Sequence, residues 1–294
     1  MPALIAAAGR PPPTIVSGLA RLGHFAVLGL LALAGLPALA VTPARAAEAV
    51  DLELVLAVDV SFSMDEDEQR LQRVGYVEAI RSPEVLAAIR DGVYGKVAVA
   101  YMEWAGAAEQ RVVVDWRVIS DAASAEAFTA MLQRQPIRRV FRTSIAEAVA
   151  TATDLIAGNG YEGIRKVIDV SGDGPNNQGR IVTAARDRAI AAGITINGLP
   201  LLLKRSANSY FDLPNLDEYY ETCVIGGAGA FLVPVRDIEA FGEAVRRKLV
   251  LEIAGGPPER AVVVPVQMTV QRSVQVDPFC TIGERIWRSR IGDN

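Results

Sequence analysis

Apolar and polar positions follow two distinct rhythms along the chain from residue 50 onward. Val50–Asp59 (VDLELVLAVD) begins with alternation and ends as a continuous apolar run, which is typical of a strand buried on both faces. Asp65–Ile80 then has a helical pattern, with acidic residues in the first turn where they favour the helix dipole. Asp59, Ser61 and Ser63 lie between the two segments. The pattern therefore predicts a buried strand that passes through a polar loop into a helix.

The same alternation of strand and helix patterns continues to residue 253 and predicts six strands in all. The later strands are expected at Lys96–Trp104, Glu109–Trp116, Lys166–Val170, Ile194–Leu201 and Gly229–Val233. Further helices are expected at Pro83–Arg90, Ser120–Gln133, Ser144–Ala157, Gly179–Ala192, Leu216–Cys223 and Asp237–Ile253. The link Ala105–Ala108 is too short for a crossover helix, so the strands it joins should form an antiparallel hairpin. We expect a doubly wound α/β domain with a mostly parallel six-stranded sheet and one antiparallel edge strand.

A Gly-Gly-Pro-Pro run at 255–258 marks the end of this domain, which therefore spans residues 47–254. The C-terminal extension, residues 255–294, contains a Val-rich segment at 261–276 that predicts one or two strands. It ends with several arginines. Two roles remain open for the extension: packing on the domain through Cys280, or docking a partner.

Residues 1–46 have the layout of a secretory signal peptide. Phe25–Val41 is apolar and uncharged, basic residues precede it, and small-x-small cleavage motifs follow, the last just before Ala47. The expected product is an exported protein, either periplasmic or secreted. The alternative is an uncleaved anchor formed by residues 25–41, which is at the short end for a membrane span and is interrupted by Pro37.

Composition narrows the classes of function. The formal net charge of the whole chain is −4. The charged residues of 1–46 are all basic, so the chain without this segment is more acidic still. An acidic chain argues against a nucleic-acid partner. The only histidine, His24, lies in the N-terminal segment, so a processed chain has no Ser-His-Asp triad and no His-ligated zinc. The two cysteines, Cys223 and Cys280, are expected to form a disulfide if the chain is exported, with two unpaired buried thiols as the alternative.

Oxygen-bearing side chains lie after two of the predicted strands and at the start of one predicted helix. Asp59, Ser61 and Ser63 follow the first strand, Thr143 opens a helix, and Asp173 follows the fourth strand. Carboxyl ends of parallel strands meet at one edge of a sheet, where α/β folds place ligands. Hydroxyls and carboxylates alone suit Mg²⁺, with Mn²⁺ or Ca²⁺ as alternatives, and two carboxylates leave a coordination position for water or for an acid from a ligand.

Each of these residues also has a purely structural interpretation. Ser63 and Ser144 both fit capping boxes, each with a glutamate three residues on, and Thr143 is itself a candidate helix cap. Asp173-Gly-Pro is ordinary turn chemistry. The basic residues Arg138, Arg139 and Arg142 form a candidate rim for an acidic partner, or a solvated loop.

Taken together, Asp59-x-Ser61-x-Ser63, Thr143 and Asp173-Gly resemble the metal-ion-dependent adhesion site (MIDAS) of von Willebrand factor type A (vWA) domains. The resemblance covers about residues 50–254 and implies that these five residues surround a divalent cation. The stretches VIDVSGDGPNN and CVIGGAGAF resemble a bacterial family of exported vWA-like proteins of unknown function, the DUF1194 group. The chain departs from many vWA domains in having Ser171-Gly172 before Asp173, and in placing Arg142 beside Thr143.

The resemblance implies a non-enzymatic binding module that engages an acidic residue of a partner protein through the cation. One alternative is a metal-dependent phosphoryl hydrolase. Against it, Ser61 stands where a second aspartate would be expected, and no lysine lies in a plausible phosphate-binding loop. The other alternative is a metal-free structural module, for which the five residues are only caps and turns.

Overall fold

The computed structural model describes residues 47–203, 213–255 and 277–291. These residues contain a five-stranded sheet in the order β3-β2-β1-β4-β5. The strands are β1 (Glu48–Asp59), β2 (Val97–Trp104), β3 (Gln110–Ile119), β4 (Tyr161–Gly172) and β5 (Thr195–Pro200). All neighbouring strands are parallel except β3, which runs antiparallel to β2 at the sheet edge. The predicted α/β class and the reversed edge strand are therefore confirmed.

The prediction of six strands is wrong for the described part of the chain. Around the predicted sixth strand, Gly229–Val233, the chain makes only isolated bridges, Leu232 with Gly198 and Val235 with Leu201. Backbone hydrogen bonds do join Gly198 to Phe231 and Val233, so the segment lies beside β5. The ladder is interrupted because Pro200 of β5 has no N–H to donate to Val233 O, although the bonds on either side of this gap, Val233 N–H to Gly198 O and Val235 N–H to Pro200 O, are present.

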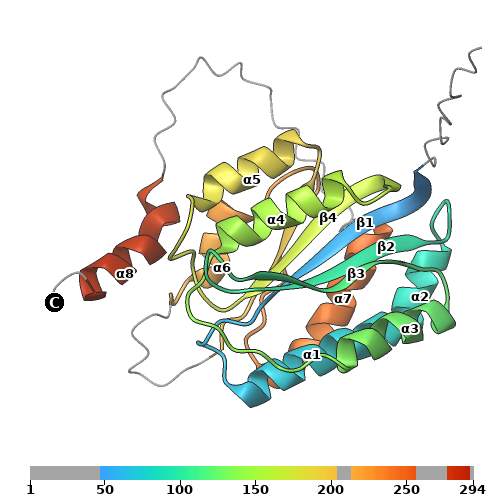
Figure 1. Cartoon of the computed structure of the whole chain (residues 1–294), viewed down its shortest axis with the longest axis horizontal. Coiled ribbons are helices and arrows are strands. Elements are labelled where there is room, and N and C mark those ends of the chain that lie inside the picture. Colours follow the sequence, from blue (N-terminus) through green and yellow to red (C-terminus); the bar gives the residue numbers. More distant parts are fainter. Residues whose placement is uncertain (1–46, 204–212, 256–276, 292–294) are drawn as a thin grey trace, which may run out of the picture. The chain divides into compact units, whose positions relative to one another are not determined.

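Helices cover both faces of the sheet (Figure 1). One face carries α1 (Glu66–Arg81), α2 (Pro83–Arg90), α3 (Ala122–Gln133) and α7 (Phe241–Ala254). The other carries α4 (Ile145–Ala157), α5 (Val182–Ala191) and the short α6 (Leu216–Tyr219), which continues into a π-helical turn, η1 (Tyr220–Val224). Two 3-10 turns precede α7 and the last helix: η2 (Ile238–Ala240) and η3 (Pro278–Thr281). The described chain ends in α8 (Ile282–Ile291).

The central strand β1 supplies both hydrophobic cores. Val55 and Ala57 belong to the core under α4 and α5, whereas Leu54 and Leu56 belong to the core under α1 and α7. All four are at most 1% exposed. This double burial explains why β1 reads as an unbroken apolar run rather than as an alternating one. It also fixes the polar loop after β1 to a rigid base.

The register of the sheet sets the position of the polar loops. Asp59 at the end of β1 pairs with Trp104 of β2, and Val58 pairs with Ser171 near the end of β4. The loops that follow β1 and β4 therefore leave the sheet side by side. That arrangement brings Asp173 to the loop that follows Asp59.

The C-terminal extension is joined covalently to the domain. Cys223 of η1 and Cys280 of η3 form a disulfide across a sequence separation of 57 residues. The expected disulfide is therefore present, and it attaches the extension to the domain. The predicted signal peptide and the Val-rich strands at 261–276 lie outside the described residues. Within the described ranges, no helix is long and apolar enough to span a membrane.

A buried ionic triad joins α7 to the sheet. The Lys248 ammonium lies 2.6 Å from Asp169 Oδ1 of β4 and also contacts Glu252, one turn further along α7. None of these three side chains is more than 1% exposed. Burial, and then the nearby Asp169 charge, raise the pKa of Glu252 to about 7. At lower pH a neutral acid therefore lies beside the Lys248–Asp169 ion pair, whereas at higher pH the triad buries a net negative charge.

Candidate metal centre

The loop after β1 folds around Asp59. This side chain is fully buried, and its Oδ1 accepts a hydrogen bond from the Ser61 backbone N–H at 2.6 Å. The following helix, α1, begins at a capping box formed by Asp65 and Glu68. Ser63 is therefore not the cap of this helix, and its structural interpretation is wrong. Its hydroxyl is left to the loop itself.

Serine hydroxyls link this loop to the loop after β4. Ser61 Oγ and Ser63 Oγ lie 2.7 Å apart, and Ser63 Oγ donates to Asp173 Oδ1 at 2.6 Å. Ser61 is 2% exposed and Asp173 is 7% exposed, whereas Ser63 between them is exposed, so the cluster is buried on one side and open to solvent at Ser63. The structure thus brings together four of the five predicted residues through direct hydrogen bonds.

Thr143 reaches the same place from the loop before α4. Val140 of that loop pairs with Ser61 in an isolated parallel bridge. Thr143 N–H donates to Asn177 Oδ1 at 3.0 Å, and Asn177 N–H donates to Thr143 O at 2.9 Å. The N-cap of α4 is Ser144, whose hydroxyl accepts from the Glu147 N–H. The cap interpretation of Thr143 is therefore wrong, whereas that of Ser144 is correct.

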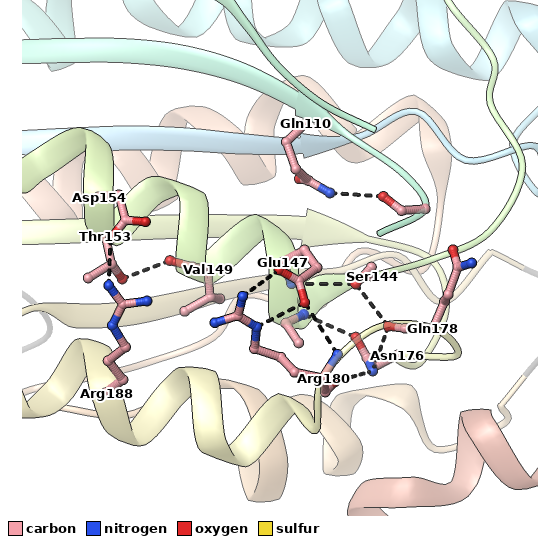
Figure 2. Close-up of polar contacts among 12 residues, drawn as sticks. Gln110, Ser144, Glu147, Val149, Thr153, Asp154, Asn176, Gln178, Arg180 and Arg188 are labelled. Carbon is pink, nitrogen blue, oxygen red and sulfur yellow. Dashed lines mark hydrogen bonds and ion pairs between the residues drawn. The ribbon is translucent and has the colours of Figure 1, made fainter. Parts of the chain in front are cut away.

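A polar network holds the segment after Asp173 against the start of α4, as Figure 2 shows. Ser144 Oγ donates to Gln178 O at 2.8 Å, and Arg180 forms an ion pair with Glu147 at 2.8 Å. Asn176 is fully buried, with its Oδ1 accepting from the Ala146 N–H. This network fixes the loop that carries Asp173, so the two loops of the candidate centre are placed before any ligand arrives.

The electrostatics of this centre favour a cation. Burial, followed by the charge of Asp173, raises the pKa of Asp59 well above its usual range. Its second oxygen, Oδ2, is buried and has no hydrogen-bond partner among the described residues. A side chain on Gly172 would put a Cβ only 3.0 Å from this oxygen, so the glycine leaves space beside it. An unpaired carboxylate oxygen next to a second carboxylate is costly unless positive charge compensates it.

The donor set fits a hard divalent cation. The centre offers two carboxylates and three hydroxyls, with no nitrogen or sulfur, which is the chemistry that Mg²⁺ prefers. Among the described residues no cluster of three or more His, Cys, Asp or Glu side chains is arranged to hold a metal ion. Any cation here would therefore depend on the hydroxyls of Ser61, Ser63 and Thr143 as well as on Asp59 and Asp173.

Two aromatic residues near the centre have no sequence signal. Tyr220, on the π-helical turn, is fully buried, and its hydroxyl has no hydrogen-bond partner within the described part of the chain. Burial and then the Asp59 charge raise the pKa of this tyrosine well above its usual value. Trp287 on α8 lies under the Arg142 guanidinium, 3.6 Å from the ring centroid to Cζ. Both residues arrive through long-range contacts, so no residue pattern local to the motif could have pointed to them.

The predicted basic rim is mostly occupied by contacts within the chain. Arg138 forms an ion pair with Glu109 at 3.2 Å. Arg139 donates to the backbone carbonyls of Phe62 and Met64. The three arginines therefore do not form one basic patch. Arg142, by contrast, lines a cavity next to Thr143.

The sheet order, the reversed edge strand and the oxygen-rich loop after β1 define a vWA-like α/β fold. The chain belongs to the family described as "Protein of unknown function (DUF1194)", whose model matches residues 49–257. No curated protein matches the chain.

Solved structures of similar fold share little sequence with this chain. Proximal thread matrix protein 1 from the mussel byssus is 13% identical, with a TM-score of 0.51 over 71% of this chain and 49% of that one. The pilus adhesin SpaC from Lactobacillus rhamnosus GG is 11% identical, with a TM-score of 0.50 over 69% of this chain and 31% of that one. A von Willebrand factor type A structure from Catenulispora acidiphila is 15% identical, with a TM-score of 0.49 over 70% of this chain and 43% of that one. The chain spans about half or less of the length of these proteins, and at such identities the likeness shows the fold alone.

Proposed function

We propose that residues 47–254 form a non-enzymatic binding module that holds a divalent cation, with Mg²⁺ as the first candidate. Through this cation the module would bind an acidic residue of a partner protein. The residues that would hold the cation are Asp59, Ser61, Ser63, Thr143 and Asp173. The observation that carries the proposal is the unpaired, buried Asp59 Oδ2, which belongs to the same hydrogen-bonded oxygen cluster as Asp173.

The chain's own residues divide the work. Asp59 and Asp173 would supply the negative charge, and the serine and threonine hydroxyls would supply neutral oxygens that orient around it. Two carboxylates do not fill an octahedral shell, so a position is left for a carboxylate of the partner. A bound divalent cation would supply positive charge that offsets the repulsion between a carboxylate of the partner and the two carboxylates of the chain.

A binding role agrees with what surrounds the centre. The cluster of oxygens opens into a cavity lined by Ser61, Ser63 and Thr143, so a ligand atom can reach it. One protein of similar fold is a pilus adhesin, and this likeness supports a binding class through the fold alone. We also propose that the chain is exported after removal of residues 1–46, because a disulfide such as Cys223–Cys280 is typical of oxidising compartments.

Thermal unfolding of the purified protein tests the cation site directly. Midpoints are compared in EDTA and in Mg²⁺, Mn²⁺ or Ca²⁺ for the wild type, for Asp59→Ala and for Asp67→Ala. The control removes an exposed aspartate of α1 that pairs with Arg70 and is not one of the five cluster residues, so it makes the same substitution outside the cluster. We expect the cation to raise the midpoint of the wild type and the control but not of Asp59→Ala. A free cation concentration of about a hundred times Kd should raise the free energy of unfolding by about 2.7 kcal/mol.

The opposite result is equally clear. If no cation shifts the wild-type midpoint, and if crystals soaked in Mn²⁺ show no anomalous peak beside Asp59, the five residues are structural and the proposed function fails.

A further inference from the structure

A cavity of about 270 Å³ opens beside the candidate metal centre. One side of it is formed by the hydroxyl-bearing residues Ser61, Ser63 and Thr143, together with Asn177. The remaining walls are Arg142 and the aromatic rings of Phe62, Phe141 and Trp287. We call this cavity the aromatic chamber. It shares its lining with the centre, so a ligand that reaches the cation also meets these rings.

Two of the three rings are exposed although they are held in place. Phe62 and Phe141 stack with centroids 4.6 Å apart and planes 8° from parallel, while 45% and 69% of their surfaces remain exposed. The Arg139 guanidinium lies 4.0 Å from the Phe62 ring, and Arg139 also donates to the Phe62 carbonyl. Exposed apolar groups that gather into one patch mark interaction sites, whereas apolar groups exposed singly do not. The chamber is therefore preorganised for contact with another molecule.

The third ring comes from the C-terminal extension. Trp287 lies on α8, which the Cys223–Cys280 disulfide and a 2.7 Å hydrogen bond from Asn176 to Glu284 attach to the domain. Arg142 lies across the indole at 3.6 Å and takes a positive φ of 79°, unusual for a residue with a side chain. Such a backbone conformation costs free energy and persists where surrounding contacts maintain it. The extension thus completes the chamber rather than lying elsewhere on the surface.

From this lining we infer that the chamber receives a large aromatic side chain adjacent in sequence to the carboxylate that reaches the cation. The partner is then a protein segment with an aspartate or glutamate beside Phe, Tyr or Trp, and Trp287 and Phe141 determine that specificity. The inference rests on the proposed function, because the cation supplies the contact for the acid.

Size and charge both support this occupant. The chamber lies just below the range of about 300–1,000 Å³ that is usual for small-molecule pockets, so it suits one side chain better than a cofactor. Its rings offer edge and face contacts to another aromatic group. Arg142 adds a positive charge near the hydroxyls, which complements an acidic segment and disfavours a basic one.

Short synthetic peptides test the inference on the full exported chain in Mg²⁺. The probes are acetylated and amidated Gly-Asp-Gly, Phe-Asp-Gly and Gly-Asp-Phe, with Asn in place of Asp as controls, titrated by calorimetry and by tryptophan fluorescence. We expect at least one aromatic peptide to bind about tenfold more tightly than Gly-Asp-Gly, the effect of burying much of one ring. The Asn peptides, EDTA and Asp59→Ala should abolish binding.

Variants of the chamber separate its role from that of the cation. Trp287→Ala and Phe141→Ala should bring the aromatic peptide down to the affinity of Gly-Asp-Gly while leaving metal-dependent binding of Gly-Asp-Gly unchanged. Tyr94→Ala is the matched control, because this tyrosine is 49% exposed and its backbone is tied to Asp51 near the start of β1, at the other end of that strand from the centre. It should change nothing.

Three results would overturn the inference. Equal affinities for all Asp peptides, unaffected by Trp287→Ala, remove the chamber from recognition and leave the proposed function standing. Equal binding of Phe-Asn-Gly and Phe-Asp-Gly means that the rings act without the acid. Failure of every Asp peptide to bind in a metal-dependent way defeats both the inference and the acid-binding part of the proposed function.

Discussion

Ser63 Oγ donates a 2.6 Å hydrogen bond to Asp173 Oδ1, across 110 residues of sequence. This single contact joins the loop after β1 to the loop after β4. Because Ser63 is not the cap of α1, the contact has no role in starting the helix. It instead sets the spacing of the two loops whose carboxylates would share a cation.

We therefore expect Ser63→Ala to lower the stability of the cation-free protein and also its affinity for the cation. Loss of a hydrogen bond to a carboxylate should lower the free energy of unfolding in EDTA by about 1–3 kcal/mol, as urea denaturation would measure. The rise in unfolding midpoint with Mg²⁺ should shrink as well. Ser63→Thr keeps the hydroxyl and should restore both. Wild-type behaviour of Ser63→Ala in both assays would contradict the bridging role.

Gly172 is expected to tolerate no side chain. A Cβ there would lie 2.8 Å from the Tyr220 hydroxyl and 3.0 Å from Asp59 Oδ2, both closer than ordinary contact. Gly172→Ala should therefore cost about 1–3 kcal/mol and reduce the midpoint shift produced by Mg²⁺. Adding Tyr220→Phe removes the nearest of the crowding atoms and should recover part of the loss in stability.

The matched control for this prediction is Gly158→Ala. A Cβ at Gly158 would meet nothing within 4 Å, and φ there is −124°, which an alanine can adopt. This variant should be neutral or slightly stabilising. Equal effects of the two substitutions would mean that general loss of a glycine, and not crowding at Asp59, is responsible.

The buried triad of α7 should make stability depend on pH. The pKa of Glu252 is about 7 in the folded protein and near its ordinary, lower value in the unfolded chain. Because the folded pKa is the higher one, its contribution is fully present below about pH 4.5 and is lost as pH rises through 7. The polar groups that contact or face Glu252 come from four elements: Asp169 and Arg165 of β4, Lys248 of α7, Asn197 of β5 and Tyr76 of α1.

Glu252→Gln should remove this dependence. Relative to the wild type, the variant should gain about 3 kcal/mol of unfolding free energy between pH 4.5 and pH 7.5, measured by urea denaturation in EDTA at several pH values. Lys248→Met is the counterpart, because it leaves two buried carboxylates unpaired and should destabilise by about 3–5 kcal/mol at pH 7. A constant difference between Glu252→Gln and the wild type across this range would show that Glu252 does not titrate there.

Reduction of the Cys223–Cys280 disulfide should release α8. Closing a loop over the 57-residue separation is worth up to about 4 kcal/mol through the entropy of the unfolded chain. The double variant Cys223→Ser with Cys280→Ser, or treatment with dithiothreitol, should lower the unfolding midpoint. It should also shift tryptophan emission to longer wavelength as Trp287 leaves Arg142. Trp287→Phe provides the control, since the buried Trp104 and Trp116 should show no such shift.

The arrangement of the centre could be predicted because it depends on a local rule. Asp59, Thr143 and Asp173 each follow or open a recognisable element, and parallel strands deliver their ends to one edge of the sheet. The sixth strand was predicted wrongly because its apolar residues suggested a ladder that is interrupted where Pro200 of β5 has no N–H to donate. Periodicity alone gives no weight to a missing N–H.

The capping signals show a second limit of the sequence. Ser63 and Ser144 both precede a glutamate at the capping-box spacing, yet only Ser144 caps its helix. The N-cap of α1 is instead Asp65, two residues after Ser63, because the helix starts later than the spacing suggests. Tyr220 and Trp287 were beyond prediction for a different reason: a π-helical turn and a covalent link place them, and neither has a periodic pattern.

The disulfide determines in which cellular compartments Trp287 is fixed covalently beside the chamber. Cytosolic thiols are kept reduced, whereas disulfides persist after export. One wall of the chamber, Trp287, is tied to the domain by that bond. Under the proposed export, the Trp287 side of the cavity would be covalently fixed only after the chain has left the cytosol. Partners that depend on Trp287 would then be bound after export and not during synthesis.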